Sequence, residues 1–368
     1  MKIGILITSI GNFGKAGFYN AQEIGLAKEL ALQIEKVAIY KLVSLDNEKQ
    51  TEKIKGYSNI TVHLIPARNS GINGMVDTRE LDGSLNAMIH FSDTQYSVPK
   101  VYHWCVKNSI HYIPYIGVVE SNSPSKVKQV ITNFIFKRNI KVYRKCVCCA
   151  KTPAVQNRLN SLGVKNVVLA PVGLDSSLLK SDYEKYSVNE LKHKYGYQNT
   201  DKILLFIGRL IDEKQPLRMI EIFSEIVNGD KCYKLLMIGT GKLKDAVVKK
   251  INDLKLNENV QLLERIPNKN VWELYRMADS YINLNQHEIF GMAILEAMYY
   301  GCKVIAWKAP GPDLVIENRI SGWIVNSNQQ VIEKIKDSTK FSKAAHNRVF
   351  NGFMWKNTAT EFFSVISK

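Results

Sequence analysis

Several features that mark other classes of protein are missing from this chain. Its six cysteines do not provide the two Cys-x-x-Cys pairs of a typical zinc site, and no apolar run is long enough to cross a bilayer. The apolar residues 3–8 are followed by no small-residue cleavage site, so a secretory signal is not expected. We therefore expect a cytoplasmic protein with buried thiols, a metal or redox site being the alternative for the cysteines.

Acidic residues are absent from one long stretch. No Asp or Glu occurs between Glu120 and Asp175, whereas ten Lys and Arg residues fall there, in a chain of net charge +16. A solvated face normally mixes its signs, so this excess predicts an anionic partner. The stretch carries no recognised nucleic-acid-binding motif, and a nucleic-acid partner is therefore not expected.

Within that stretch, residues 126–145 interleave cations with large apolar residues such as Ile131 and Phe134. This pattern resembles a surface that lies against anionic lipid. The alternative is a helix and a strand whose apolar residues face the core and whose cations are only solvated. The first interpretation predicts a protein bound peripherally at the inner face of the plasma membrane.

Apolar, β-rich runs alternate with segments of helical period, as in parallel sheets covered by helices on both faces. We expect strands in the first half near residues 2–8, 36–42, 60–64, 87–91, 114–119, 146–150 and 166–170. In the second half we expect strands at 203–207, 234–238, 259–263, 280–284 and 303–306, with helices such as 216–227 and 271–277. The sequence thus predicts an α/β fold with two doubly wound domains.

A Pro/Gly turn at residues 170–175 marks the expected boundary, because a strand ends there and the acid-free stretch stops. The predicted domains are residues 1–172 and 173–348. Residues 349–368 contain an amphipathic pattern and are predicted to form a final helix that packs back on the first domain.

Ligands of open parallel sheets bind beyond the carboxyl ends of the strands, so binding residues are expected in the turns there. After 203–207, Gly208 is followed by Arg209 and Lys214, which could place two cations on one phosphate; ordinary surface cations are the alternative. After 234–238, Gly239 and Gly241 allow close approach of a ligand, or serve only as tight-turn residues.

The third turn, after 280–284, carries two carboxylates. Glu288 lies in the loop and Glu296 two turns inside the following helix, a spacing that suits opposite ends of one extended polar ligand. A solvated helix face is the alternative, but the neighbours of Glu296 are apolar, and this disfavours it.

The segment from Glu288 to Glu296 resembles the E-x7-E signature, E-x-F-G-x-x-x-x-E, of the retaining glycosyltransferases of glycosyltransferase family 4. The Gly208 turn with Lys214 and the glycines of the second turn also resemble motifs of that family. The resemblance covers the C-terminal half in order and implies the GT-B fold, in which two Rossmann-like domains face a central cleft.

The resemblance also implies roles for individual residues. Arg209 and Lys214 would bind the diphosphate of a nucleotide-sugar donor, and Glu296 would hold the ribose hydroxyls. Glu288 would hold the sugar, together with the backbone of neighbouring residues of the turn. The remaining residues that this resemblance places at the donor are Gly17, Gly208, Gly239, Phe290, Gly291, Met292 and Ala293.

The N-terminal half departs from the family pattern at two points. Gly17-Phe18 stands where the family usually has Gly-Gly, and Glu120 stands where a His often contacts the transferred sugar. Glu120 is therefore assigned to the acceptor side of the site.

The chain has no Asp-x-Asp pair, with which metal-dependent glycosyltransferases hold a divalent cation on the diphosphate. We therefore expect no metal and no cofactor, and transfer with retention from a UDP-sugar to a glycan or lipid-linked acceptor in bacterial surface-polysaccharide synthesis. Alternatives are a GT-B phosphorylase or epimerase and, from another class, a basic nucleic-acid-binding protein.

Overall fold

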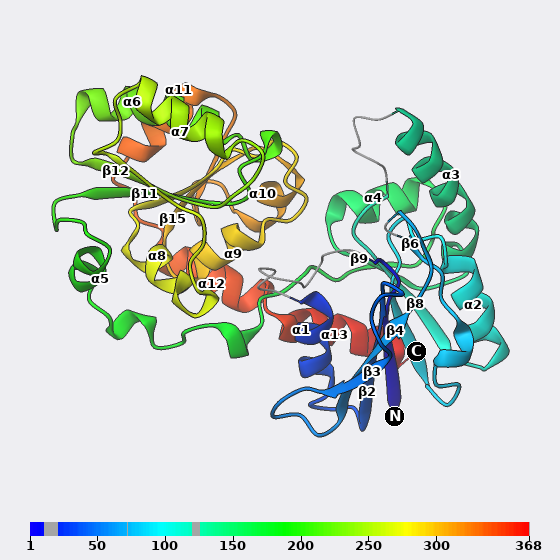
Figure 1. Ribbon diagram of the computed structural model, residues 1–368. Coiled ribbons are helices and arrows are strands. Elements are labelled where there is room, and N and C mark those ends of the chain that lie inside the picture. Colours follow the sequence, from blue (N-terminus) through cyan, green and yellow to red (C-terminus); the bar gives the residue numbers. More distant parts are fainter. Residues whose placement is uncertain (11–20, 72, 120–125, 368) are drawn as a thin grey trace. The chain divides into compact units, whose positions relative to one another are not determined.

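The computed structural model describes residues 1–10, 21–71, 73–119 and 126–367, and the chain divides into two compact units (Figure 1). Residues Met1–Gly173 and Met354–Lys368 form the first unit, and Leu174–Phe353 form the second. Among the described helices, none combines the length and the apolar character that spanning a membrane requires.

The first unit is built on an eight-stranded sheet of order β10-β9-β8-β7-β1-β2-β4-β3. All neighbouring strands are parallel except β3, which runs antiparallel to β4 at the edge. The bounds are β1 Lys2–Ile7, β2 Lys36–Val43, β3 Gln50–Lys53, β4 Ile60–Pro66, β7 Ala87–Phe91, β8 His111–Ile116, β9 Cys148–Ala150 and β10 Val167–Leu169. Central strands such as β1 are apolar on both faces because helices cover both sides.

The α-helices among the described residues of this unit are α1 Gln22–Leu30, α2 Val98–Lys107, α3 Lys126–Tyr143, α4 Pro153–Ser161 and α13 Trp355–Ile366. A small hairpin pairs β5 Asn69–Ser70 with β6 Asn73–Gly74. Residues 126–143 form one helix, and not the helix and strand of the alternative interpretation. The C-terminal segment does not form one helix. The helix α12, Ser342–Gly352, ends before Met354, and α13 begins after it. The N–H of Met354 donates to the side-chain oxygen of Asn357 at the start of α13.

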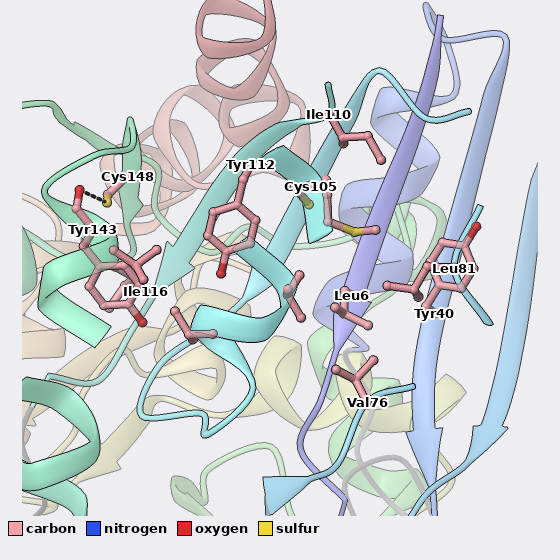
Figure 2. Close-up of a cluster of buried hydrophobic side chains, with 14 of the residues drawn as sticks. Leu6, Tyr40, Val76, Leu81, Cys105, Ile110, Tyr112, Ile116, Tyr143 and Cys148 are labelled. Carbon is pink, nitrogen blue, oxygen red and sulfur yellow. Dashed lines mark hydrogen bonds between the residues drawn. The ribbon is translucent and has the colours of Figure 1, made fainter. Parts of the chain in front are cut away.

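A continuous hydrophobic core lies on the α2 and α3 side of this sheet, and Figure 2 shows part of it. Leu6 and Ile116 come from the strands, whereas Cys105 and Tyr143 come from α2 and α3. All six cysteines are free thiols. Four are buried as predicted, but Cys232 is exposed, because it lies in the turn before β12 and not within a strand.

The second unit contains a six-stranded parallel sheet of order β13-β12-β11-β14-β15-β16. In chain order this is 3-2-1-4-5-6, the order of a doubly wound Rossmann sheet. The strands are β11 Lys202–Ile207, β12 Tyr233–Ile238, β13 Val260–Leu263, β14 Ser280–Asn283, β15 Lys303–Trp307 and β16 Trp323–Val325. The predicted α/β class with two doubly wound units is therefore observed.

Helices cover both faces of this second sheet. They are α5 Val188–Lys194, α6 Pro216–Gly229, α7 Lys244–Asp253, α8 Val271–Met277, α9 Met292–Tyr299, α10 Pro310–Val315, α11 Asn328–Lys336 and α12. Apolar residues of α6, including Met219 and Phe223, pack against strand residues such as Leu204 and Leu235. This packing fixes the positions at which the strand-to-helix turns leave the sheet.

Candidate functional site

The strand order of the second unit changes direction between β11 and β14. Ligands of doubly wound sheets bind at such a switch point, beyond the carboxyl ends of the strands. The turn that begins with Gly208 follows β11, and the segment from Leu284 to Gly291 follows β14. Two of the three predicted turns therefore flank the switch point.

The first and second turns pack against each other through their backbones. The N–H of Leu210 donates to the carbonyl oxygen of Thr240 over 2.9 Å. A Cβ atom on Gly239 would lie 1.9 Å from the carbonyl oxygen of Gly208, and one on Gly241 would lie 2.5 Å from that of Leu210. These two glycines are thus required for the contact between the turns, a role that the sequence motif does not reveal.

The two cations of the first turn differ in their surroundings. Lys214 ends a short 3-10 turn, Asp212–Lys214, and its Nζ lies 2.6 Å from Oε2 of Glu288. The side chain of Arg209 is exposed and forms no hydrogen bond or ion pair with the described part of the chain. The structure therefore joins Lys214 to the third turn and leaves the guanidinium of Arg209 available to an incoming anion.

Three donors converge on one oxygen of Glu288. Besides Lys214, the side-chain amides of Asn285 and Asn283 donate to Oε2 over 3.2 and 3.3 Å. Burial would raise the pKa of Glu288, but the charge of Lys214 and these hydrogen bonds outweigh burial and hold the pKa below its ordinary value. Glu288 is therefore an ionised carboxylate with a fixed orientation.

Asn283 and Asn285 were not among the predicted site residues. Their side-chain oxygens accept from the N–H groups of Asn285 and His287, both over 2.9 Å, and this shapes the turn. The available signal was two amides two residues apart, at the end of a buried strand and just before Glu288. Polar side chains at the carboxyl end of a strand at the switch point are well placed to contact a ligand.

The backbone after Glu288 is also constrained. Gly291 has φ 90° and ψ 60° and precedes the first turn of α9, so Met292 and Ala293 supply N–H groups that the helix itself leaves without partners. Phe290 is buried against Phe353, with ring centroids 6.4 Å apart. A helix start with free N–H groups is suited to binding an anion.

Glu296 lies on α9 and is 8% exposed. Its apolar neighbours in the helix, Ile294, Leu295, Ala297 and Met298, are buried, so this is not a solvated helix face. The hydroxyl of Tyr275, on α8, donates to its Oε2 over 3.0 Å. Burial raises the pKa of Glu296 to about 7, although the hydrogen bond from Tyr275 lowers it.

Some predictions cannot be placed in this site. Gly17 and Glu120 lie outside the described residues. Within the described ranges, no three His, Cys, Asp or Glu side chains come together as metal ligands.

The second unit also has a hollow of about 470 Å³, whose lining includes Tyr195 and Gln261. This hollow reaches Lys234 at the amino end of β12 and therefore lies at the edge of the sheet opposite the switch point.

Comparisons with known proteins relate part of the chain to one family of enzymes. Residues 187–352 match the family described as Glycosyl transferases group 1. The N-acetyl-alpha-D-glucosaminyl L-malate synthase of Bacillus anthracis is 26% identical over 192 residues, 50% of this chain and 50% of that protein. The alpha-monoglucosyldiacylglycerol synthase of Streptococcus pneumoniae is 24% identical over 276 residues, 74% of this chain and 57% of that protein. The match thus spans about half to three fifths of these relatives.

Among solved structures, Anabaena HepE in complex with UDP and glucose superposes with a TM-score of 0.71 at 15% identity, covering 100% of this chain and 99% of that one. This likeness shows the fold, which is GT-B as predicted. The described site residues, from Gly208 to Glu296, all fall within the segment that matches the family. Together, these comparisons show the GT-B fold and a likeness of residues 187–352 to the group 1 glycosyltransferases.

Proposed function

We propose that this chain is a retaining glycosyltransferase that transfers a sugar from a UDP-sugar to a glycan or lipid-linked acceptor in bacterial surface-polysaccharide synthesis. The observation that carries the proposal is the pair of carboxylates at the switch point. One is ionised and bound to Lys214, and the other is buried beside Tyr275. By their names, one of the two relatives makes a sugar derivative of malate and the other makes a glycolipid.

The donor is proposed to lie across the three turns. Arg209, Lys214 and the first turn of α9 bind the diphosphate and stabilise the negative charge that develops on it as the sugar leaves. Glu296 binds the ribose hydroxyls. Since Lys214 already contacts Glu288, its ammonium group can bridge this carboxylate and the phosphate oxygens.

Glu288 is proposed to position the sugar. Its Oε2 accepts three hydrogen bonds, whereas Oε1 accepts none from the described residues and can accept from a sugar hydroxyl. Three donors on one carboxylate stabilise its charge and lower its nucleophilicity, which favours positioning over covalent attack. Transfer then occurs on one face of the sugar, and the leaving phosphate takes the proton of the acceptor.

The proposal requires no metal and no cofactor, because side chains and helix N–H groups supply the positive charge. It also places the protein in the cytoplasm, bound peripherally to the inner face of the plasma membrane through residues 126–145. At that surface a lipid-linked acceptor would be directly accessible.

The experiment is a screen of nucleotide sugars for acceptor-dependent release of nucleoside diphosphate. Arg209→Ala and Lys214→Ala are expected to reduce turnover by roughly 100-fold each, the usual effect of removing one group that stabilises the transition state. Glu296→Ala is expected to weaken binding of the nucleotide sugar. Lys249→Ala, an exposed cation on α7, is the matched control and should behave as wild type.

Wild-type turnover in all three site variants would refute the proposed site. Sugar release that needs orthophosphate and produces no nucleotide would show that the enzyme is a phosphorylase instead.

A further inference from the structure

The first half of α3 exposes a row of large apolar side chains. Val127, Val130, Ile131 and Phe134 are 69%, 68%, 53% and 69% exposed. Their spacing of three, one and three residues places them on one face of the helix. We call these four residues the apolar stripe. Contiguous exposed apolar patches usually mark a site of contact with a protein or a membrane.

The second half of the same helix is anchored in the first unit. Phe136, Ile140 and Tyr143 are buried in its core. The side-chain amide of Asn139 donates to the Gln95 carbonyl oxygen over 2.8 Å. In Figure 1 the helix begins well away from the strands of this unit and runs down toward α2. The apolar stripe is thus presented by a helix whose other half is firmly packed.

Cations continue the face of the apolar stripe toward the end of the helix. Lys137 and Lys141 follow Phe134 at spacings of three and seven residues, and Lys145 lies just beyond. All three are exposed, and none forms an ion pair with a described residue. Their ammonium groups are therefore available to an outside partner.

Two other cations of this segment are already engaged. The guanidinium of Arg138 lies 4.2 Å from the centroid of the Tyr96 ring, and Arg144 donates to the Leu162 carbonyl oxygen over 2.7 and 3.0 Å. The sequence pattern alone counted them with the lipid-facing cations. A variant that removes them would disturb packing as well as charge.

An anionic lipid surface can bind both parts of this face, the apolar stripe and the lysines that follow it. Apolar side chains of an amphipathic helix enter the boundary between headgroups and acyl chains, while lysines bind anionic headgroups. A nucleic acid would leave the aliphatic residues of the stripe in water. A second copy of the chain would bring the same cations together across a symmetric interface, where their like charges would repel each other.

We propose that α3 inserts the apolar stripe into the interfacial layer of an anionic membrane, with Lys137, Lys141 and Lys145 at the headgroups. This inference rests on the membrane position in the proposed function and deepens it. It assigns the attachment to insertion of the apolar stripe in the first half of α3, together with charge from lysines in the second half of the helix and just beyond it.

The test is co-sedimentation with vesicles of phosphatidylcholine alone and of phosphatidylcholine mixed with phosphatidylglycerol, at low and high salt. No nucleotide sugar is present, so failure of the donor assignment would leave the result unaffected. Wild type is expected to bind the anionic vesicles, and part of this binding should survive high salt because insertion is not screened.

Two variants separate the contributions. Changing Val130, Ile131 and Phe134 to Gln should reduce partitioning at least tenfold at both salt concentrations. Changing Lys137, Lys141 and Lys145 to Gln should reduce it at low salt and remove the salt dependence. Leu32→Gln and Val106→Gln, also exposed apolar residues of the first unit, form the matched control and should bind as wild type.

A direct measure of insertion is a Phe134→Trp variant mixed with vesicles of brominated lipid, in which quenching should exceed that of wild type. Equal binding to both kinds of vesicle would overturn the proposal. Undiminished binding by the Val130, Ile131 and Phe134 variant would also overturn it, since attachment would then be electrostatic only. Absence of vesicle binding together with a wild-type dimer that this variant dissociates would assign the stripe to a second copy instead.

Discussion

Replacing Glu296 by Gln is predicted to make the protein more stable at alkaline pH. In the folded protein, burial raises the pKa of Glu296 from 4.5 to about 7. Between these values the folded state binds a proton that the unfolded state has lost, so the free energy of unfolding falls as the pH rises. Each pH unit in this range lowers the free energy of unfolding by about 1.4 kcal/mol, so the total loss above neutrality is about 3 kcal/mol.

The glutamine variant removes this cost and keeps the shape of the side chain. Its amide oxygen can still accept the hydrogen bond of Tyr275, so the packing of α8 on α9 should not change. The stabilisation of the variant relative to wild type should therefore grow by about 2 to 3 kcal/mol from pH 5 to pH 8.

The measurement is urea unfolding of both proteins at several pH values. Glu225→Gln, on the exposed side of α6, is the control and should show no pH-dependent difference from wild type. A stability difference between Glu296→Gln and wild type that is the same at pH 5 and pH 8 would refute the buried, proton-binding carboxyl. A residue that lowers stability and is nevertheless present at a switch point is a strong candidate for a functional role.

Four further outcomes are expected. Binding of a nucleotide sugar should tighten by roughly tenfold from pH 6 to pH 8 as Glu296 ionises, and titration calorimetry on Glu296→Gln should show no such trend. Asn285→Ala should reduce kcat/KM about tenfold by removing one of the hydrogen bonds that hold Glu288, and wild-type kinetics would contradict this. Gly25→Val should lower the stability of the first unit by about 1 to 3 kcal/mol or more, because a Cβ would lie 2.2 Å from Nε1 of Trp355; an unchanged melting temperature would disprove that packing. Turnover should survive excess EDTA, and a loss that magnesium or manganese restores would disprove the metal-free mechanism.

The central strands could be predicted because they are buried on both faces and appear as apolar runs. β3 was missed because it lies at an exposed edge and consists of polar residues, Gln50–Lys53. β16 was missed because it has only three residues, Trp323–Val325. The strand predicted at 114–119 lies at 111–116, since Pro114 is not its first residue but sits within β8.

For the site, the sequence indicated which turns matter but not how their side chains meet. Lys214 and Glu288 are 74 residues apart, and their ion pair depends on how two turns leave neighbouring strands. The opposite pKa shifts of Glu288 and Glu296 likewise depend on burial and on partners such as Asn283. The role of Gly239 in the contact between the turns likewise cannot be inferred from the sequence.

The division of the chain between its units has a consequence for biosynthesis. The first unit consists of residues up to Gly173 and then of those from Met354 on. Trp355 and Phe362 of α13 are fully buried in it, and the Phe362 ring contacts that of Tyr115, with centroids 5.2 Å apart. On the ribosome, all of the second unit emerges before α13 does, so the first unit keeps an exposed apolar face until α13 is synthesised. A chain that lacks α13 would therefore contain all residues of the second unit but leave this apolar face of the first unit uncovered.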